Sequence, residues 1–307
     1  MKVGALGFAV EQEQGWQTAR AHVRIFPVHF ARTFSMQRLG PHDPTAELVG
    51  DCFRKAFFYR GAAAAVEICR ERDGKHEGEY DGLLVSAFGP EAERLLDETV
   101  RGLSQDDGYA DFMTEDTGVL RLHRSLPGLR LLRVPWLYDM TCSAILQQRI
   151  RTVDAMRDWR RIAQRYGAAG PLGLRVFPPA EMLARVPLFA LEQMGIDGKR
   201  ARTLLKFARE MAFVRLDGEL SFQMLRERLL RVPGIGPWTA ESVMGYGAGD
   251  TDAAIPGDLH LPRVVCYALA GEQGGTDERM MELLEPFRGH RFRIIRLLYA
   301  AGLDVPW

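Results

Sequence analysis

One stretch decides how this chain folds: Leu229-Leu230-Arg231-Val232-Pro233-Gly234-Ile235-Gly236-Pro237-Trp238-Thr239-Ala240. Leu225, Leu229 and Val232 recur at the spacing of one helix face. Pro233 ends that helix, because proline has no backbone N–H and restricts the residue before it. Two glycines then allow a tight turn, and Pro237 suits the first position of a second helix. The stretch predicts two helices joined by a short turn whose exposed N–H groups could hold a phosphate.

A Pro-Gly-x-Gly turn is also a common connection between helices, and short motifs produce false matches. Further along lies Pro256-Gly257-Asp258, with Asp258 20 residues after Trp238. This combination resembles the helix–hairpin–helix of the DNA glycosylase superfamily, which pairs a Gly/Pro-rich hairpin with a trailing aspartate. Within the superfamily it is most similar to the 3-methyladenine DNA glycosylase II branch, which acts on alkylated bases.

Four other stretches resemble the same branch, and they occur in the expected order. They are Leu-Pro-Gly-Leu-Arg at 126–130, Ala-Ile-Leu-Gln-Gln-Arg at 144–149, Gly-Ile-Asp-Gly-Lys-Arg-Ala at 195–201, and Glu-Pro-Phe-Arg-Gly-His-Arg at 285–291, where Phe287 replaces a tryptophan. The resemblance therefore covers roughly residues 126–301. The first third of the chain fits it only in being rich in strand signals.

The pattern of the whole chain predicts an α+β fold in two parts. Residues 1–20 look like a polar lead-in, and strand signals between about 21 and 89, including 28–30, predict a small antiparallel sheet. From 91 onward the signals are helical. We therefore divide the chain into a strand-rich domain at 1–90 and a helical glycosylase domain at 91–307, with the hairpin at about 221–247.

The composition is that of a folded protein, with 47% hydrophobic and 26% charged residues among 307. Its formal net charge is zero, but the segment between residues 120 and 166 contains ten arginines and only three acidic residues. Such a local excess is either a footprint for phosphates or a solvated helix face. The sequence alone favours the second interpretation for this segment.

The four cysteines are widely spaced and lack the CxxC pattern, so neither zinc nor an iron–sulfur cluster is indicated. We expect no metal and no cofactor. No signal peptide or membrane span is recognisable. The expectation is a reduced, monomeric cytoplasmic protein, associated with the nucleoid through double-stranded DNA that carries alkylated bases.

Asp258 has two interpretations. Before an apolar run, an aspartate is a preferred helix N-cap, worth about 1 kcal/mol. The resemblance implies instead that Asp258 is the catalytic carboxylate, since its distance from the hairpin matches the family's spacing. A carboxylate at a helix N-terminus tends to stay ionised, as stabilising a positively charged deoxyribose requires. Asp250 and Asp252, in the preceding loop, are weaker candidates.

Trp238 occupies the position where bifunctional members of the superfamily carry a nucleophilic lysine. An indole cannot form a Schiff base, so a monofunctional hydrolase is expected. Trp238 could stack on an electron-poor base or simply pack in the core. By position, Ser242 and Arg296 would join it in the base pocket, where the branch often has aromatic residues.

The remaining DNA contacts are assigned by the resemblance. The hairpin would bind phosphate through six residues: Val232, Gly234, Ile235, Gly236, Trp238 and Thr239. Base flipping leaves a gap in the duplex, and by position Arg149 would fill it while Gln148 reaches neighbouring bases. Arg149 departs from the family's apolar wedge and could equally meet a phosphate.

The sequence thus predicts a DNA glycosylase that removes alkylated purines without a lyase step. Two alternatives stay open. One is a non-catalytic DNA-binding protein that keeps the hairpin only for phosphate contacts. The other is a glycosylase for an uncharged, deaminated or oxidised purine.

Overall fold

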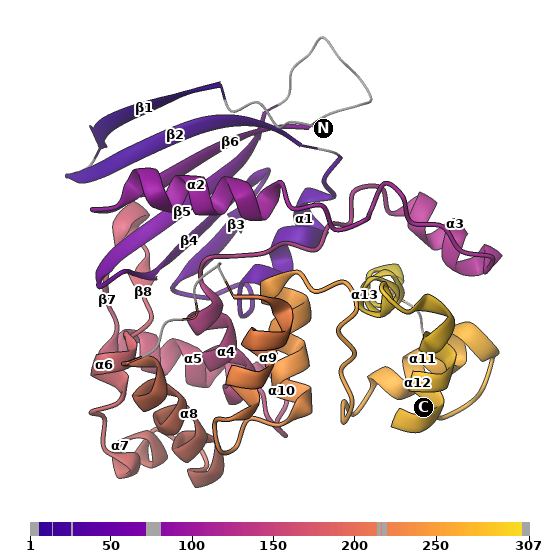
Figure 1. The fold of residues 1–307 in the computed structure, drawn as a ribbon. Coiled ribbons are helices and arrows are strands. Elements are labelled where there is room, and N and C mark those ends of the chain that lie inside the picture. Colours follow the sequence, from indigo (N-terminus) through magenta and orange to yellow (C-terminus); the bar gives the residue numbers. More distant parts are fainter. Residues whose placement is uncertain are drawn as a thin grey trace.

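A computed structural model describes residues 6–13, 15–25, 27–71, 81–213, 216 and 220–302. Its first part is an antiparallel sheet of six strands in the order β1-β2-β6-β5-β4-β3. The strands are β1 (Leu6–Glu13), β2 (Trp16–Ile25), β3 (Ala46–Val49), β4 (Cys52–Tyr59), β5 (Ala62–Glu71) and β6 (Asp81–Phe88). Figure 1 shows the sheet above a group of helices, which agrees with the predicted α+β class.

The strands of the sheet direct successive side chains to opposite faces. Both faces are covered by other parts of the chain. On one face Phe53 and Phe57 belong to a core with Leu95 and Leu96 of helix α2 (Ala92–Leu103). The same core contains Trp136, from well beyond the predicted boundary at residue 90. That division of the chain stays an interpretation, since the sheet packs against residues on both sides of it.

The structure corrects two local predictions. Residues 6–13 and 15–20 are not a loose lead-in but form β1 and the first half of β2, since their register with each other and with β6 is continuous apart from a bulge after Leu6. Residues 28–30 are not a strand: β2 ends at Ile25, and a short helix α1 (Phe30–Phe34) follows. The predicted turn at 72–75 lies outside the described residues.

The second part is helical, with one small exception. A two-stranded ribbon, β7 (Ala168–Ala169) and β8 (Arg175–Val176), was missed because each strand is too short to show an alternating pattern. It covers the other face of the large sheet, where Leu174 and Val176 pack against Ala56 and Ala65. The helices of this part are α3 (Thr117–Ser125), α4 (Leu137–Leu146), α5 (Thr152–Tyr166), α6 (Ala180–Leu183), α7 (Leu188–Gln193), α8 (Gly198–Met211), α9 (Phe222–Leu230), α10 (Pro237–Val243), α11 (Leu261–Ala270), α12 (Asp277–Leu284) and α13 (Arg291–Ala301).

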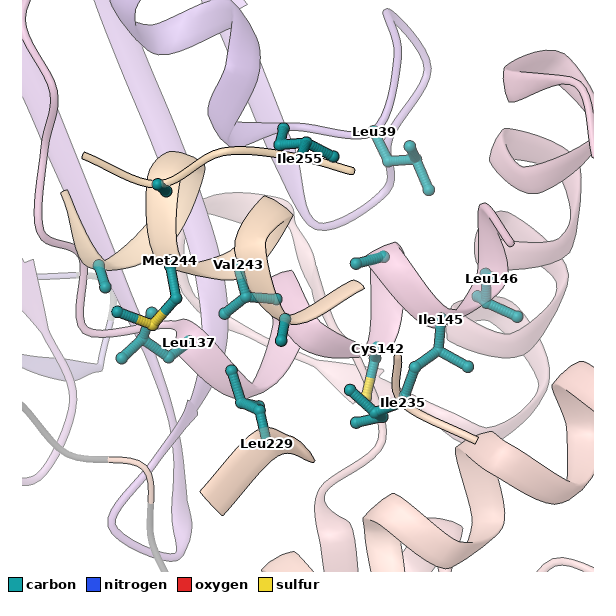
Figure 2. Close-up of a cluster of buried hydrophobic side chains, with 14 of the residues drawn as sticks. Leu39, Leu137, Cys142, Ile145, Leu146, Leu229, Ile235, Val243, Met244 and Ile255 are labelled. Carbon is teal, nitrogen blue, oxygen red and sulfur yellow. The ribbon is translucent and has the colours of Figure 1, made fainter. Parts of the chain in front are cut away.

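The core of the helical part is built around α4, which is apolar on nearly all sides. Its residues Cys142, Ile145 and Leu146 are fully buried, and Figure 2 shows Cys142 and Ile145 beside Ile235 of the hairpin turn. Leu229 of α9 joins the same core. The hairpin is therefore held by a largely buried helix. In the described part of the chain, each helix falls short of the length and apolar character needed to cross a bilayer.

The cysteines differ from the reduced state that the sequence analysis expected. Cys52 and Cys69 are opposite one another in the β4–β5 register, and a disulfide joins them. Their separation of 17 residues hides the pairing from a search for short motifs. Cys142 and Cys266 are buried free thiols.

A buried ion cluster fastens the segment after α2 to α13. Both oxygens of Asp107 are used: Arg130 pairs with one at 2.8 Å, and Arg293 pairs with the other at 3.1 Å. The Leu131 N–H donates to the same carboxylate at 3.0 Å. All three charged side chains are 5% exposed or less, and burial lowers the pKa of Arg293.

We predict that Asp107→Asn lowers the free energy of unfolding by roughly 3–5 kcal/mol, because two buried guanidinium groups lose their counter-charge. Urea denaturation would measure this. Asp97→Asn is the matched control, since Asp97 pairs with Arg101 on the surface, with side chains more than half exposed. That variant should change stability by less than about 1 kcal/mol. Equal effects of the two variants would show that the buried cluster stabilises the fold no more than a surface ion pair does.

Candidate active site

The hairpin joins α9 to α10 through a turn at residues 231–236. Gly234 has φ of 105°, and a Cβ there would collide with the side chain of Thr203 on α8. Gly234 is thus required both by its backbone conformation and by the close approach. Gly236 differs: its φ is −101° and a Cβ would meet nothing within 4 Å. The backbone at Gly236 is therefore open for a ligand to approach.

Three of the residues predicted to contact DNA have buried side chains. Val232 and Ile235 are in the helical core, 3% and 5% exposed, and Thr239 is 2% exposed. Any contact they make with DNA would therefore have to come from the backbone. The α10 N-terminus, beginning at Pro237, supplies N–H groups that have no partner within the helix.

Gln148 and Arg149 lie in the loop between α4 and α5, beside the hairpin. The Gln148 amide donates to the Gly234 carbonyl at 3.1 Å and to the Thr239 hydroxyl at 2.8 Å. Arg149 is exposed and has a positive φ of 56°, which is uncommon for a residue with a side chain. The two predicted residues are thus brought to one surface with the hairpin.

Asp258 is held by three donors. Trp238 Nε1 donates to its Oδ2 at 2.9 Å, and the backbone N–H groups of His260 and Leu261 donate to its Oδ1, each at 2.9 Å. Leu261 is the first residue of α11 and His260 is its N-cap, so Asp258 accepts from the N–H groups at the start of this helix. This geometry fits a stabilising role at the helix start, and the catalytic role of Asp258 stays a prediction.

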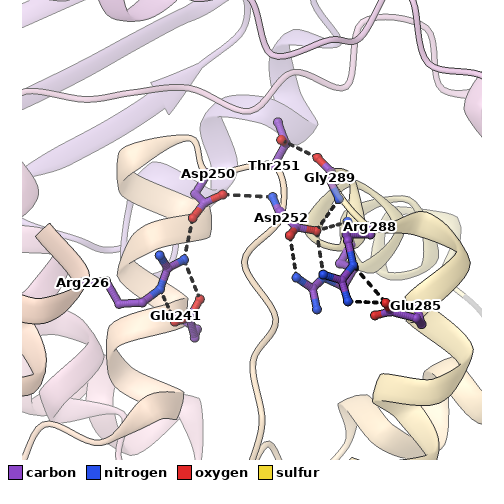
Figure 3. A network of polar contacts seen from close by, with 9 residues as sticks. Arg226, Glu241, Asp250, Thr251, Asp252, Glu285, Arg288 and Gly289 are labelled. Atoms are coloured by element: carbon purple, nitrogen blue, oxygen red, sulfur yellow. Dashed lines mark hydrogen bonds and ion pairs between the residues drawn. The ribbon is translucent and has the colours of Figure 1, made fainter. Parts of the chain in front are cut away.

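The two weaker candidates for the catalytic carboxylate form ion pairs with arginines, as Figure 3 shows. Asp250 accepts from Arg226 on α9 at 2.6 Å, and the same guanidinium binds Glu241 of α10. Asp252 accepts from Arg291 and from the Gly289 N–H at 2.7 Å. Although burial alone would raise the pKa of Asp252, these hydrogen bonds lower it. Both aspartates fasten the loop that ends at Asp258.

Asp258 borders a cavity of about 600 Å³, within the usual range of small-molecule sites. Trp238 and Ser242 of α10 line it, as predicted for a base pocket. The rest of the cavity wall was not predicted from the sequence. The additional lining includes Trp159 of α5, Tyr246 after α10, Tyr299 of α13, the segment 35–41 after α1, Lys55 of β4 and Asp139 of α4. Those residues come from positions far apart in the chain, so no local motif links them.

Arg296 does not line this cavity. Its guanidinium lies over the Tyr246 ring at 5.5 Å and donates to the Arg32 carbonyl at 3.1 Å. Arg296 therefore supports the wall from behind, and Tyr246 takes the lining position instead. Burial raises the pKa of Tyr246 and of Tyr299, and Asp258 adds to the rise in both. The two phenols stay neutral at neutral pH.

The arginines of residues 120–166 are not a uniform surface face. Arg130 is in the buried ion cluster, and Arg133 donates to the Leu220 carbonyl. Arg151 and Arg157 both pair with Asp154. Among the residues that the structure describes, no group of three or more His, Cys, Asp or Glu could hold a metal ion.

Comparison with known proteins identifies the helical part. Residues 142–288, which contain the hairpin and Asp258, match the model of the HhH-GPD superfamily base excision DNA repair proteins. The matched residues, just under half of the chain, are thus similar to the HhH-GPD superfamily. The match begins on α4 and ends just before α13, so it covers the helical core and leaves the sheet outside.

Two relatives are similar to parts of this chain. A "Probable bifunctional transcriptional activator/DNA repair enzyme AlkA" of Mycobacterium tuberculosis is 32% identical over 142 residues, 44% of this chain and 28% of the relative. The "DNA-3-methyladenine glycosylase" of Bacillus subtilis is 29% identical over 128 residues, 39% of this chain and 42% of the relative. The chain thus spans less than half the length of either.

The whole fold, including the sheet, occurs in solved structures. A 3-methyladenine DNA-glycosylase from Archaeoglobus fulgidus superposes with a TM-score of 0.74 at 22% identity, covering 93% of this chain and 99% of that one. An 8-oxoguanine glycosylase/lyase from Clostridium acetobutylicum superposes at 0.67 with 14% identity, covering 95% and 97%. At these identities the likeness establishes the fold alone, and the sheet followed by the helices is confirmed.

The capping role of Asp258 can be measured as stability. Asp258→Ala removes the acceptor for two backbone N–H groups and should cost about 1 kcal/mol, as lost N-caps do. Asp258→Asn keeps an acceptor oxygen and should cost no more than about half of that. Urea denaturation of both variants measures the difference. An alanine variant as stable as the original protein would show that Asp258 does not cap α11.

Proposed function

We propose that this protein is a monofunctional DNA glycosylase that hydrolyses the N-glycosidic bond of alkylated purines flipped out of duplex DNA. The observation that carries the proposal is the bond from Trp238 to Asp258, which places a carboxylate at the cavity beside the hairpin. The names of the relatives support the choice of alkylated bases.

The chemistry follows from the surroundings of Asp258. The C1′–N bond breaks and the base leaves with its electron pair, so positive charge develops on the sugar. A carboxylate held by three N–H donors stabilises that charge and orients water toward C1′. Water supplies the hydroxyl at C1′, and its proton passes to Asp258 or to solvent. An alkylated purine is cationic and leaves as a neutral base, so no strong acid is needed.

The aromatic wall suits such a leaving group. Trp159, Trp238, Tyr246 and Tyr299 all border the cavity, and ring faces attract cations. Trp238 also replaces the nucleophilic lysine expected of a lyase, so the product is an abasic site in an unbroken strand.

DNA would be held next to the cavity. The open backbone at Gly236 and the α10 N-terminus face a phosphate, and Arg149, exposed in the loop tied to the hairpin by Gln148, fills the gap left by the flipped base. We place the protein with DNA in the cytoplasm, as a monomer.

Asp258→Asn should abolish base release while leaving affinity for damaged duplex within about threefold, because the amide keeps shape and capping but loses the charge. The assay is release of 3-methyladenine and 7-methylguanine from methylated DNA, with strand cleavage scored separately. Release by the variant at the original rate would reduce Asp258 to a cap. If the unaltered protein frees no base from any alkylated duplex, the result favours the alternative of a non-catalytic DNA-binding protein.

A lesion panel separates the two glycosylase alternatives. Duplexes that carry hypoxanthine or 8-oxoguanine test the uncharged purines in the same assay. Faster release of these than of methylated bases would overturn the preference for alkylated purines.

Gly236→Asp should weaken binding to damaged and undamaged duplex alike. Loss of a hydrogen bond to a charged group costs about 1.5–3 kcal/mol, which corresponds to roughly tenfold or more in Kd. The new side chain meets no neighbour, so the variant should fold normally. Gly236→Ala is the control, since it adds a Cβ without a charge. Fluorescence anisotropy with labelled duplex measures both, and unchanged binding by the aspartate variant would exclude the turn from the DNA interface.

A further inference from the structure

The cavity contains a second carboxylate that the proposed mechanism does not use. Asp139, on α4, lines the cavity, and its side chain is only 4% exposed. Lys55, on β4, pairs with its Oδ2 at 2.9 Å and is 3% exposed. Asp258, by contrast, is half-buried, and it borders the same cavity. The cavity is thus lined by one half-buried carboxylate and one that is almost fully buried.

The Lys55 ammonium is fully committed to the protein. Besides Asp139, it donates to the Thr45 hydroxyl at 2.7 Å, and it lies 5.4 Å from the centre of the Trp159 ring. Asp139 is only half committed. Within the described part of the chain, Lys55 alone pairs with its carboxylate, through Oδ2, and no N–H or O–H group donates to its Oδ1. A carboxylate oxygen that lacks a donor in a cavity wall can accept a hydrogen bond from a ligand's N–H.

Asp43 provides a comparison in the same wall. It also lines the cavity, but both of its oxygens are taken: the Leu39 N–H donates to Oδ2, and the Thr45 N–H, the Thr45 hydroxyl and Trp159 Nε1 donate to Oδ1, all at 2.7–2.9 Å. Asp43 is therefore a structural carboxylate, whereas Asp139 keeps accepting capacity toward the cavity.

We propose that Asp139, positioned by Lys55, reads the flipped base by accepting a hydrogen bond from an N–H at its Watson–Crick edge. This rests on the proposed function. Its ligand class is a purine with an amino or ring N–H donor, such as 3-methyladenine or 7-methylguanine. The positive charge of these bases makes their N–H groups stronger donors, and a carboxylate acceptor strengthens the bond further. A base whose edge is closed by a fused ring, such as 1,N6-ethenoadenine, offers no such donor.

Asp139→Asn should lower kcat/KM for 3-methyladenine and 7-methylguanine by about 10- to 100-fold, as expected for losing a hydrogen bond between charged groups. Release of 1,N6-ethenoadenine should change by less than about threefold. The ratio between the two kinds of base is the readout, because a purely structural role would lower all of them together. An unchanged ratio overturns the proposal. Asp43→Asn is the matched control, and a similar change of the ratio by that variant also overturns it.

A second variant guards against misfolding. In Lys55→Met/Asp139→Leu, apolar side chains of similar size replace both charges, an exchange that proteins commonly tolerate. This variant should melt cooperatively and should lose the preference for bases with an N–H donor. If it keeps the preference, Asp139 does not read the base.

Binding of the free bases distinguishes failure of this proposal from failure of the proposed function. Quenching of tryptophan fluorescence measures binding of 3-methyladenine and 1,N6-ethenoadenine without any hydrolysis. Tighter binding of 3-methyladenine that the Asp139 variants lose supports the proposal even if no base is released from DNA. Equal binding of both bases to the unaltered protein overturns it, whatever the rate of release.

Discussion

Asp258 depends on a loop whose first residues are held by two arginine–carboxylate pairs. Arg226 ties Asp250 to α9 and α10, and Arg291 ties Asp252 to α13. The loop then runs to Asp258, where Trp238 and the start of α11 fix the carboxylate. A change in the angle between the hairpin and α13 would therefore shift the position of Asp258. The loop thus links the hairpin and α13 to the carboxylate that we propose as catalytic.

Local chemistry made part of this site readable from sequence. The helix stop at Pro233, the turn glycines and the helix start at Pro237 are each imposed by one residue's backbone, so the hairpin lies where it was predicted. The cap at Asp258 follows from the same kind of rule. The tryptophan–aspartate contact could be anticipated only through the family spacing, because 20 residues of loop and helix separate the partners.

The rest of the cavity could not be read because it is assembled from distant segments. Lys55 comes from the sheet, Asp139 from α4 and Tyr299 from α13. Nothing in the sequence around each of them indicates that they line the same cavity. Arg296 shows the converse error. Its position in the family pattern pointed to the pocket, but a long guanidinium side chain packs more favourably on the Tyr246 ring, and the tyrosine faces the cavity instead. The first half of β2 was missed for a related reason: its pairing partner β6 lies some 60 residues further on, and β1 pairs in turn with β2.

The sheet is therefore part of the site and not merely an attached domain. Lys55 lies on β4 between Phe53 and Phe57, whose rings pack in the sheet's own core. The strand alternates its side chains, so the packing of the two phenylalanines orients the lysine between them on the same face. Trp136, which packs on both rings, precedes α4, the helix that carries Asp139. One aromatic cluster thus positions both members of the buried ion pair, one from each part of the chain. The cavity then has two carboxylates in contrasting surroundings: Asp258 is held by neutral N–H donors near solvent, and Asp139 is held by a buried cation. Differences of this kind between two acids let one act on the developing charge of the sugar while the other recognises the base.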